Sequence, residues 1–368
     1  MVRRPDLLGA ASRLPRVDLS AFPTRALLRW DLAVRLFLSL AIPLVVGVAL
    51  GDVGEVSIAA TMAAALVSFG TLGPDLSSRP WQAVTALGVP LAIVLGVASS
   101  RLASGGVVVV FLLFTAFGAF ARAGFVAQLS WFPVATAGML AALLIGPEAS
   151  LGQVAVGAAL GAVLAVVLSI VIPLLLRPPT LTLPAQALQV DTDRLHRMVR
   201  HPSWHDWAYP LVLGVVSAAL LVVFDALTGG FKPYWAVLAF VSVLAPTAAE
   251  TRRSAWETIT STVAGVALAA LVLALDLRPP ATAVTIAVLG TIGALLLLRQ
   301  GFASKALITP LPVVLATATP GTDAAFALPV RLGEYVVGAA LGVVVVVLTD
   351  WADRQVTTAS TQETAIVG

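Results

Sequence analysis

The chain consists of long apolar runs separated by short polar, glycine-containing or proline-containing breaks. These runs approach the roughly 20 apolar residues that an α-helix needs to cross a bilayer. Because the runs are apolar on most sides, their ends are set by the breakers and not by amphipathic periodicity. We therefore predict twelve transmembrane helices, at residues 31–50, 55–72, 81–99, 106–121, 126–145, 151–176, 208–226, 232–249, 254–275, 280–298, 303–319 and 328–350.

Two sequence echoes suggest that the chain contains an internal repeat. Val156–Gly161 reads Val-Gly-Ala-Ala-Leu-Gly, as does Val337–Gly342, and Arg79-Pro80-Trp81 pairs with Arg253-Ser254-Ala255-Trp256. An even number of spans in each half makes both halves insert the same way up. We expect an all-α polytopic membrane protein of two parallel six-helix repeats, divided as a tail (1–29), a first half (30–176), a linker (177–207), a second half (208–350) and a tail (351–368).

The composition excludes an ordinary soluble domain. The sequence is 59% hydrophobic, 11% charged and has a mean hydropathy of +0.99, whereas soluble domains are about half apolar and one-quarter charged. It has no cysteine, which excludes disulfides and thiolate chemistry. It also lacks the Gly-x4-Gly-Lys-Ser/Thr loop that cradles nucleotide phosphates. We predict no cofactor and no bound metal, and lipid as the surrounding partner.

The positive charges favour one orientation. With the N-terminus inside, seventeen Lys and Arg lie in cytoplasmic segments, whereas the opposite side holds only Arg101, Lys232, Arg278 and Arg331. Positive loops stay cytoplasmic, so we expect both termini in the cytoplasm of a bacterium and the helices in its inner membrane. This placement explains the sequence pI of about 9.8 without a nucleic-acid partner.

The linker is predicted to hold one short amphipathic cytoplasmic helix at about residues 186–200. It also contains all three histidines of the chain, His196, His201 and His205. A regulatory or metal-binding role is one interpretation of these histidines, and solvated linker residues are the other.

The second half resembles the fusaric acid resistance (FUSC) and aromatic acid exporter family. The resemblance rests on Lys232-Pro233-Tyr234-Trp235-Ala236, the exit Leu244-Ala245-Pro246, and the loop Thr251-Arg252-Arg253. The following helix keeps Thr262 and Gly265 of the family pattern, but has Thr258 and Ser261 in place of Arg and Gly. The resemblance implies an inner-membrane exporter of small organic, often aromatic, carboxylic acids.

On the outer side we expect a substrate site around Tyr234 and Trp235. A lysine, Lys232, beside two aromatic rings suits an aromatic anion, although an aromatic belt at the membrane interface would also explain the rings. Asp225 and Glu334 are the nearby carboxylates, and the repeat places Gln153 at the position of Glu334. Glu334 and Asp225 are candidate coupling residues, and for Glu334 a helix-end carboxylate in water is the alternative.

Further candidates lie on the cytoplasmic side. Arg252 and Arg253 could collect an anion from the cytosol, and a stripe that includes Thr258 and Thr262 could line a path or bridge to neighbouring helices. Asp31 and Arg35, four residues apart on one helix face, could pair as coupling residues or could snorkel to the interface as a helix-end pair. The prolines Pro133, Pro310 and Pro312 allow a broken fifth helix in each half, and a kink that only improves packing is the more common alternative.

Three functional classes follow from these features. The first is a gradient-driven exporter of organic anions, although none of the predicted spans has an Asp, Glu or His near its middle, where proton-coupled carriers usually keep one. The second is an anion channel or facilitator, and the third is a membrane partner in cell-envelope assembly. A membrane enzyme is disfavoured, because no clustered catalytic set occurs. The sequence leaves the oligomeric state open, a homo-oligomer included.

Overall fold

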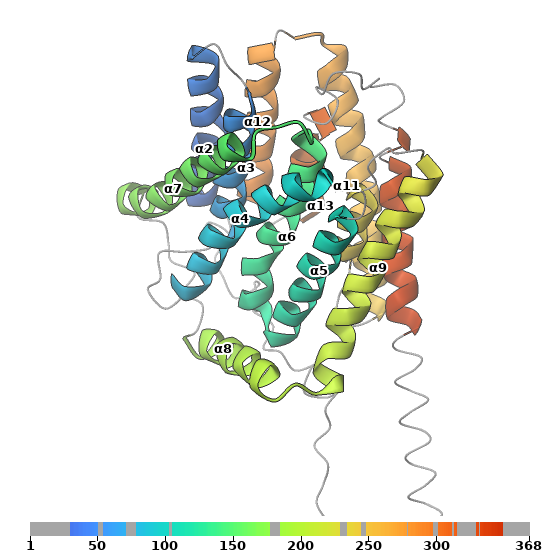
Figure 1. Cartoon of the computed structure of the whole chain (residues 1–368). Coiled ribbons are helices and arrows are strands. Elements are labelled where there is room, and N and C mark those ends of the chain that lie inside the picture. The colour runs from blue at the N-terminus through green and yellow to red at the C-terminus, as the bar shows by residue number, and fades with distance from the viewer. Residues whose placement is uncertain are drawn as a thin grey trace, which may run out of the picture.

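The computed structural model describes residues 30–50, 54–70, 79–102, 105–176, 185–228, 234–243, 248–277, 279–296, 301–310, 313–314, 329–330 and 332–348. Within these ranges every regular element is a helix (Figure 1). The helices are α2 (Trp30–Ala49), α3 (Glu55–Gly70), α4 (Arg79–Ser100), α5 (Gly105–Ala123), α6 (Phe125–Leu144), α7 (Leu151–Leu176), α8 (Ala185–Arg200), α9 (Trp204–Thr228), α10 (Tyr234–Val243), α11 (Ala248–Ala274), α12 (Pro279–Leu296), α13 (Gly301–Ile308) and the last helix, Leu332–Leu348.

Most of the predicted helices coincide with these elements. Helix α7 has the predicted bounds of 151–176, and α2, α4, α5, α6 and α12 begin and end within two residues of prediction. The linker helix α8 is also confirmed, one residue longer than expected. Breakers at the ends of apolar runs were therefore sufficient to locate these helices.

Several helix ends differ from prediction. Helix α11 begins at Ala248 and not at 254, and its backbone is helical through Glu250, Arg252 and Arg253. The prediction placed the start too late because it followed the apolar run, and a helix can begin before its apolar part does. Helix α9 begins four residues early, at Trp204, where the Ser203 hydroxyl accepts a hydrogen bond from the Asp206 amide at 3.3 Å.

The fifth helices of the two halves also differ from prediction. Helix α6 continues through the buried Pro133, so no break occurs there. Helix α13 ends at Ile308, earlier than the predicted 319, and two residues before Pro310. Pro312 and residues 315–319 of the predicted span lie outside the described residues.

Within the described ranges, six helices are long and apolar enough to cross a membrane. Four shorter apolar helices accompany them, at Glu55–Gly70, Tyr234–Val243, Val284–Gly293 and Leu332–Leu348. Many large apolar side chains on these helices face outward, as in Leu174, which is 70% exposed. Such surfaces suit lipid and not water, so the protein is a multi-pass membrane protein.

Several helices that are far apart in the sequence pack together. Helix α2 packs on α12, and α9 packs on α5 (Figure 1). Helix α3 packs on α7, and α4 on α6, as α11 does on α13. The largest core cluster spans both halves and includes Phe114, Leu213, Trp235 and Phe240.

The linker helix α8 lies across one end of the bundle (Figure 1) and contacts α5 and α6. Its Asp191 is buried, and the carboxylate accepts a hydrogen bond from the Ala127 amide in the first turn of α6 at 3.2 Å. Leu195 packs on a small cluster formed by Trp81, Ala123 and Ala127. The hydrogen bond from the Ala127 amide to Asp191 and the packing of Leu195 therefore both hold α8 against the bundle.

Candidate functional site

The aromatic pair that opens α10 lies inside the protein. Tyr234 is 5% exposed and Trp235 is 1% exposed, and the Trp235 ring lies 5.7 Å from that of Tyr335 in the last helix. Gly106 of α5 lies next to the Tyr234 hydroxyl and to Leu221 of α9. Because the rings face protein and not lipid, the aromatic-belt interpretation is wrong for this pair.

The carboxylates predicted near this pair have different surroundings. Glu334 is 2% exposed, in the first turn of the last helix, and its charge acts on the neighbouring Tyr335. It is therefore not a helix-end carboxylate in water. Asp225 is exposed near the end of α9, within electrostatic range of Tyr234. Lys232 lies outside the described residues.

The two polar positions that the sequence echo aligns differ in burial. Gln153, in the first turn of α7, is exposed, whereas Glu334 is buried. The ionisable member of the pair is the one that the protein interior encloses. An ionisable residue in such a place is expensive and is a functional candidate by default.

Helix α11 carries the predicted polar stripe. Thr258, Ser261 and Thr262 are all buried, and the Ser261 hydroxyl donates to the Thr258 carbonyl at 3.1 Å. Arg252 and Arg253 are exposed at the start of the same helix. The stripe thus faces the protein interior, and the two arginines lie on the surface near the helix end.

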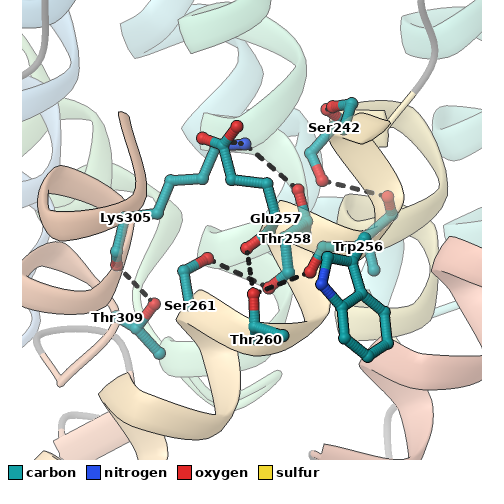
Figure 2. A network of polar contacts seen from close by, with 10 residues as sticks. Ser242, Trp256, Glu257, Thr258, Thr260, Ser261, Lys305 and Thr309 are labelled. Carbon is teal, nitrogen blue, oxygen red and sulfur yellow. Dashed lines mark hydrogen bonds and ion pairs between the residues drawn. The ribbon is translucent and has the colours of Figure 1, made fainter. Parts of the chain in front are cut away.

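Lys305 of α13 joins this stripe. Figure 2 shows its side chain reaching across to α11, where the ammonium donates to Thr258 Oγ1 at 3.1 Å and lies 3.6 Å from Glu257 Oε1. The Lys305 and Glu257 side chains are 37% and 34% exposed. Helices α11 and α13 approach closely further along, since a Cβ on Gly265 would lie 2.8 Å from the Ala306 carbonyl oxygen.

The pair on the first helix is also buried. Arg35 Nη2 lies 3.2 Å from Asp31 Oδ2, and the two side chains are 1% and 5% exposed. Their helix packs on α3 and α12 through Leu32, Leu36 and Leu40. The two charges therefore do not snorkel to the surface, and the predicted pairing is present.

Lys305 was not among the predicted site residues, because its meeting with Glu257 depends on the packing of two helices. A sequence signal for Lys305 did exist. It is one of only two lysines among 22 basic residues. Among the described residues, no group of three His, Asp or Glu could hold a metal ion.

A family comparison matches the second half. Residues 211–345 match the model described as fusaric acid resistance protein-like. Neither the search of curated proteins nor that of solved structures finds a match. The matched segment holds the aromatic pair, Glu334 and the Lys305 cluster, so residues 211–345 form a fusaric acid resistance protein-like domain, as the sequence pattern predicted.

Proposed function

We propose that the protein is a gradient-driven transporter that exports small organic anions, aromatic carboxylates above all, across the bacterial inner membrane. The observation that carries this proposal is the buried carboxylate of Glu334 within the fusaric acid resistance protein-like domain. A carboxylate enclosed among apolar membrane helices is costly, and carriers use such groups to bind and release protons. Its neighbour Tyr335 links it to the aromatic residue Trp235.

We further propose that the chain crosses the membrane twelve times as two parallel six-helix repeats, with both termini in the cytoplasm. The reciprocal packing of α2 on α12 and of α9 on α5 supports this arrangement, because a two-fold axis between the halves would produce both contacts. The same holds for Gly157, which touches Val56 in the first half, and Gly338, which touches Ala236 in the second.

The substrate site is proposed to involve Lys232, Tyr234 and Trp235 on the outer side. Arg252, Arg253, Thr258 and Thr262 would act on the cytoplasmic side. The burial of Tyr234 and Trp235 fits a state in which the outer side is closed. A transporter must alternate between such closed states and open ones.

The test is transport by purified protein in liposomes, with a panel of aromatic carboxylates and an imposed pH gradient. We expect saturable flux that stops when the gradient is collapsed, and we expect Glu334→Gln and Lys232→Ala to reduce it without loss of membrane insertion. Gln153→Ala is the matched control, because Gln153 is the exposed repeat counterpart of Glu334.

Other results would change the assignment. Normal flux in both variants would reject the outer-site proposal. Flux that follows membrane potential alone would indicate a channel. No flux with any anion would favour a partner in envelope assembly.

A further inference from the structure

Lys305 contacts a helix that is a candidate membrane span. Its hydrogen-bond partner Thr258 is on the candidate span Thr251–Ala274, seven residues from the first one, or about 10 Å along the helix at about 1.5 Å per residue. An ammonium at this depth is costly against lipid, and such groups face the protein interior or a water-filled cavity. The Lys305 side chain is 37% exposed, so a ligand can reach its ammonium from outside the helix pair.

The approach to Lys305 has a direction. The contact of Gly265 with Ala306 and Thr309 closes the space between the two helices on one side of Lys305. The other side leads toward the start of α11, where Arg252 and Arg253 are exposed. By the predicted orientation this is the cytoplasmic side, from which an exported anion would arrive.

We infer that Lys305 and Thr258 form a binding site for one carboxylate group of an organic anion, and that Glu257 occupies this site when no anion is bound. The inference rests on the proposed export function and gives its cytoplasmic site a chemical identity. Lys305 supplies the charge, Thr258 fixes the position of the ammonium, and Glu257 is an internal competitor.

The distances support this assignment of roles. The Lys305–Glu257 separation of 3.6 Å is an ion pair without a close hydrogen bond, whereas a well-placed carboxylate approaches an ammonium to about 2.8 Å. The ammonium has three donors, of which Thr258 Oγ1 takes one. Glu257 is about one-third exposed, so its carboxylate can turn to water at little cost when an anion replaces it.

The arrangement also selects the ligand class. A single ammonium and a hydroxyl match one carboxylate, and a second negative charge on the ligand would lie close to the displaced Glu257. Like charges at short range disfavour binding. We therefore expect monocarboxylates to bind in preference to dicarboxylates of similar size.

The test is equilibrium binding of benzoate and of phthalate to the purified full-length protein in detergent, by calorimetry. Glu257→Gln removes the competitor, so we expect the Kd for benzoate to fall roughly two- to five-fold, the value of a partly exposed ion pair. The preference for benzoate over phthalate should shrink in the same variant. Lys305→Met should lose benzoate binding, and Glu257→Gln should not restore it in the double variant.

Glu148→Gln and Arg200→Met are the matched controls, because they change the same charges at exposed positions far along the chain. An unchanged Kd in Glu257→Gln, or normal binding by Lys305→Met, would overturn the inference. Thr258→Val is a second test of the site. It removes the hydroxyl but keeps the charges of Lys305 and Glu257, so it should weaken benzoate binding. The binding and transport experiments can also disagree. If the Kd values follow the expected pattern but the protein shows no flux in liposomes, the binding site is retained and the export function is rejected.

Discussion

Gly338 of the last helix lies directly against the main-chain carbonyl oxygen of Ala236 in α10. One turn later, Gly342 approaches the Phe240 carbonyl of the same helix. In the first half, Gly157 and Gly161 of α7 meet the carbonyls of Val56 and Ala60 in α3 in the same way. Small residues four apart permit such backbone contact between membrane helices.

A methyl group at these glycines should force the helices apart. We expect Gly157→Ala and Gly338→Ala each to destabilise the protein by about 1–3 kcal/mol, the usual cost of overpacking, despite alanine's better helix propensity. Thermal unfolding of each variant in detergent measures this loss of stability.

Two other glycines on the same helices serve as controls for this prediction. Gly152 and Gly333 are five residues before Gly157 and Gly338, and neither has a crowded Cβ position. Alanine should be tolerated or slightly stabilising at both. Equal stability of all four variants would contradict the close contact of these helices.

The Asp31–Arg35 pair should be required for stability. Arg35→Met leaves the Asp31 carboxylate buried without its guanidinium partner, which costs about 3–5 kcal/mol. The double variant Arg35→Met with Asp31→Leu should recover much of this loss, because no charge then remains. A stable Arg35→Met protein that no longer transports would instead assign the pair to coupling.

Much of the helical framework could be predicted from the sequence, because long apolar runs and breakers act locally. The bounds of α7 follow from Gly146-Pro147 before it and Pro178-Pro179 after it. The start of α11 could not be predicted in this way. Its first turns carry Glu250 and Arg252, and a helix outside the membrane has no hydropathy signal.

The site was predicted only in part, for a related reason. The Asp31–Arg35 pair was predictable because its members are four residues apart on one helix. The Lys305–Thr258 hydrogen bond joins residues 47 positions apart, and the burial of Trp235 depends on Tyr335 of the last helix. Such contacts depend on tertiary packing, which a single sequence does not encode locally.

Asp191 should hold the linker helix against the bundle. Asp191→Ala removes the cap on α6, which is worth about 1 kcal/mol, so we expect faster limited proteolysis around α8. Asp193→Ala is the control, because Asp193 is exposed on the same helix. Gly124→Ala should resemble Asp191→Ala, since its methyl group would collide with the Asp191 carboxylate. Identical cleavage rates in Asp191→Ala and Asp193→Ala would show that the apolar contacts alone dock α8.

Asp276 ends α11 in the left-handed conformation, with φ of 45°. Glycine adopts this conformation without steric cost, whereas a side chain costs roughly 1–2 kcal/mol, less for Asp than for most residues. Asp276→Gly should therefore raise the unfolding temperature, and Asp276→Ala should lower it. Both variants remove the same charge, so opposite shifts can come only from the backbone. Shifts of the same sign in a thermal melt would mean that the Asp276 carboxylate, and not its φ angle, determines the stability of this helix end.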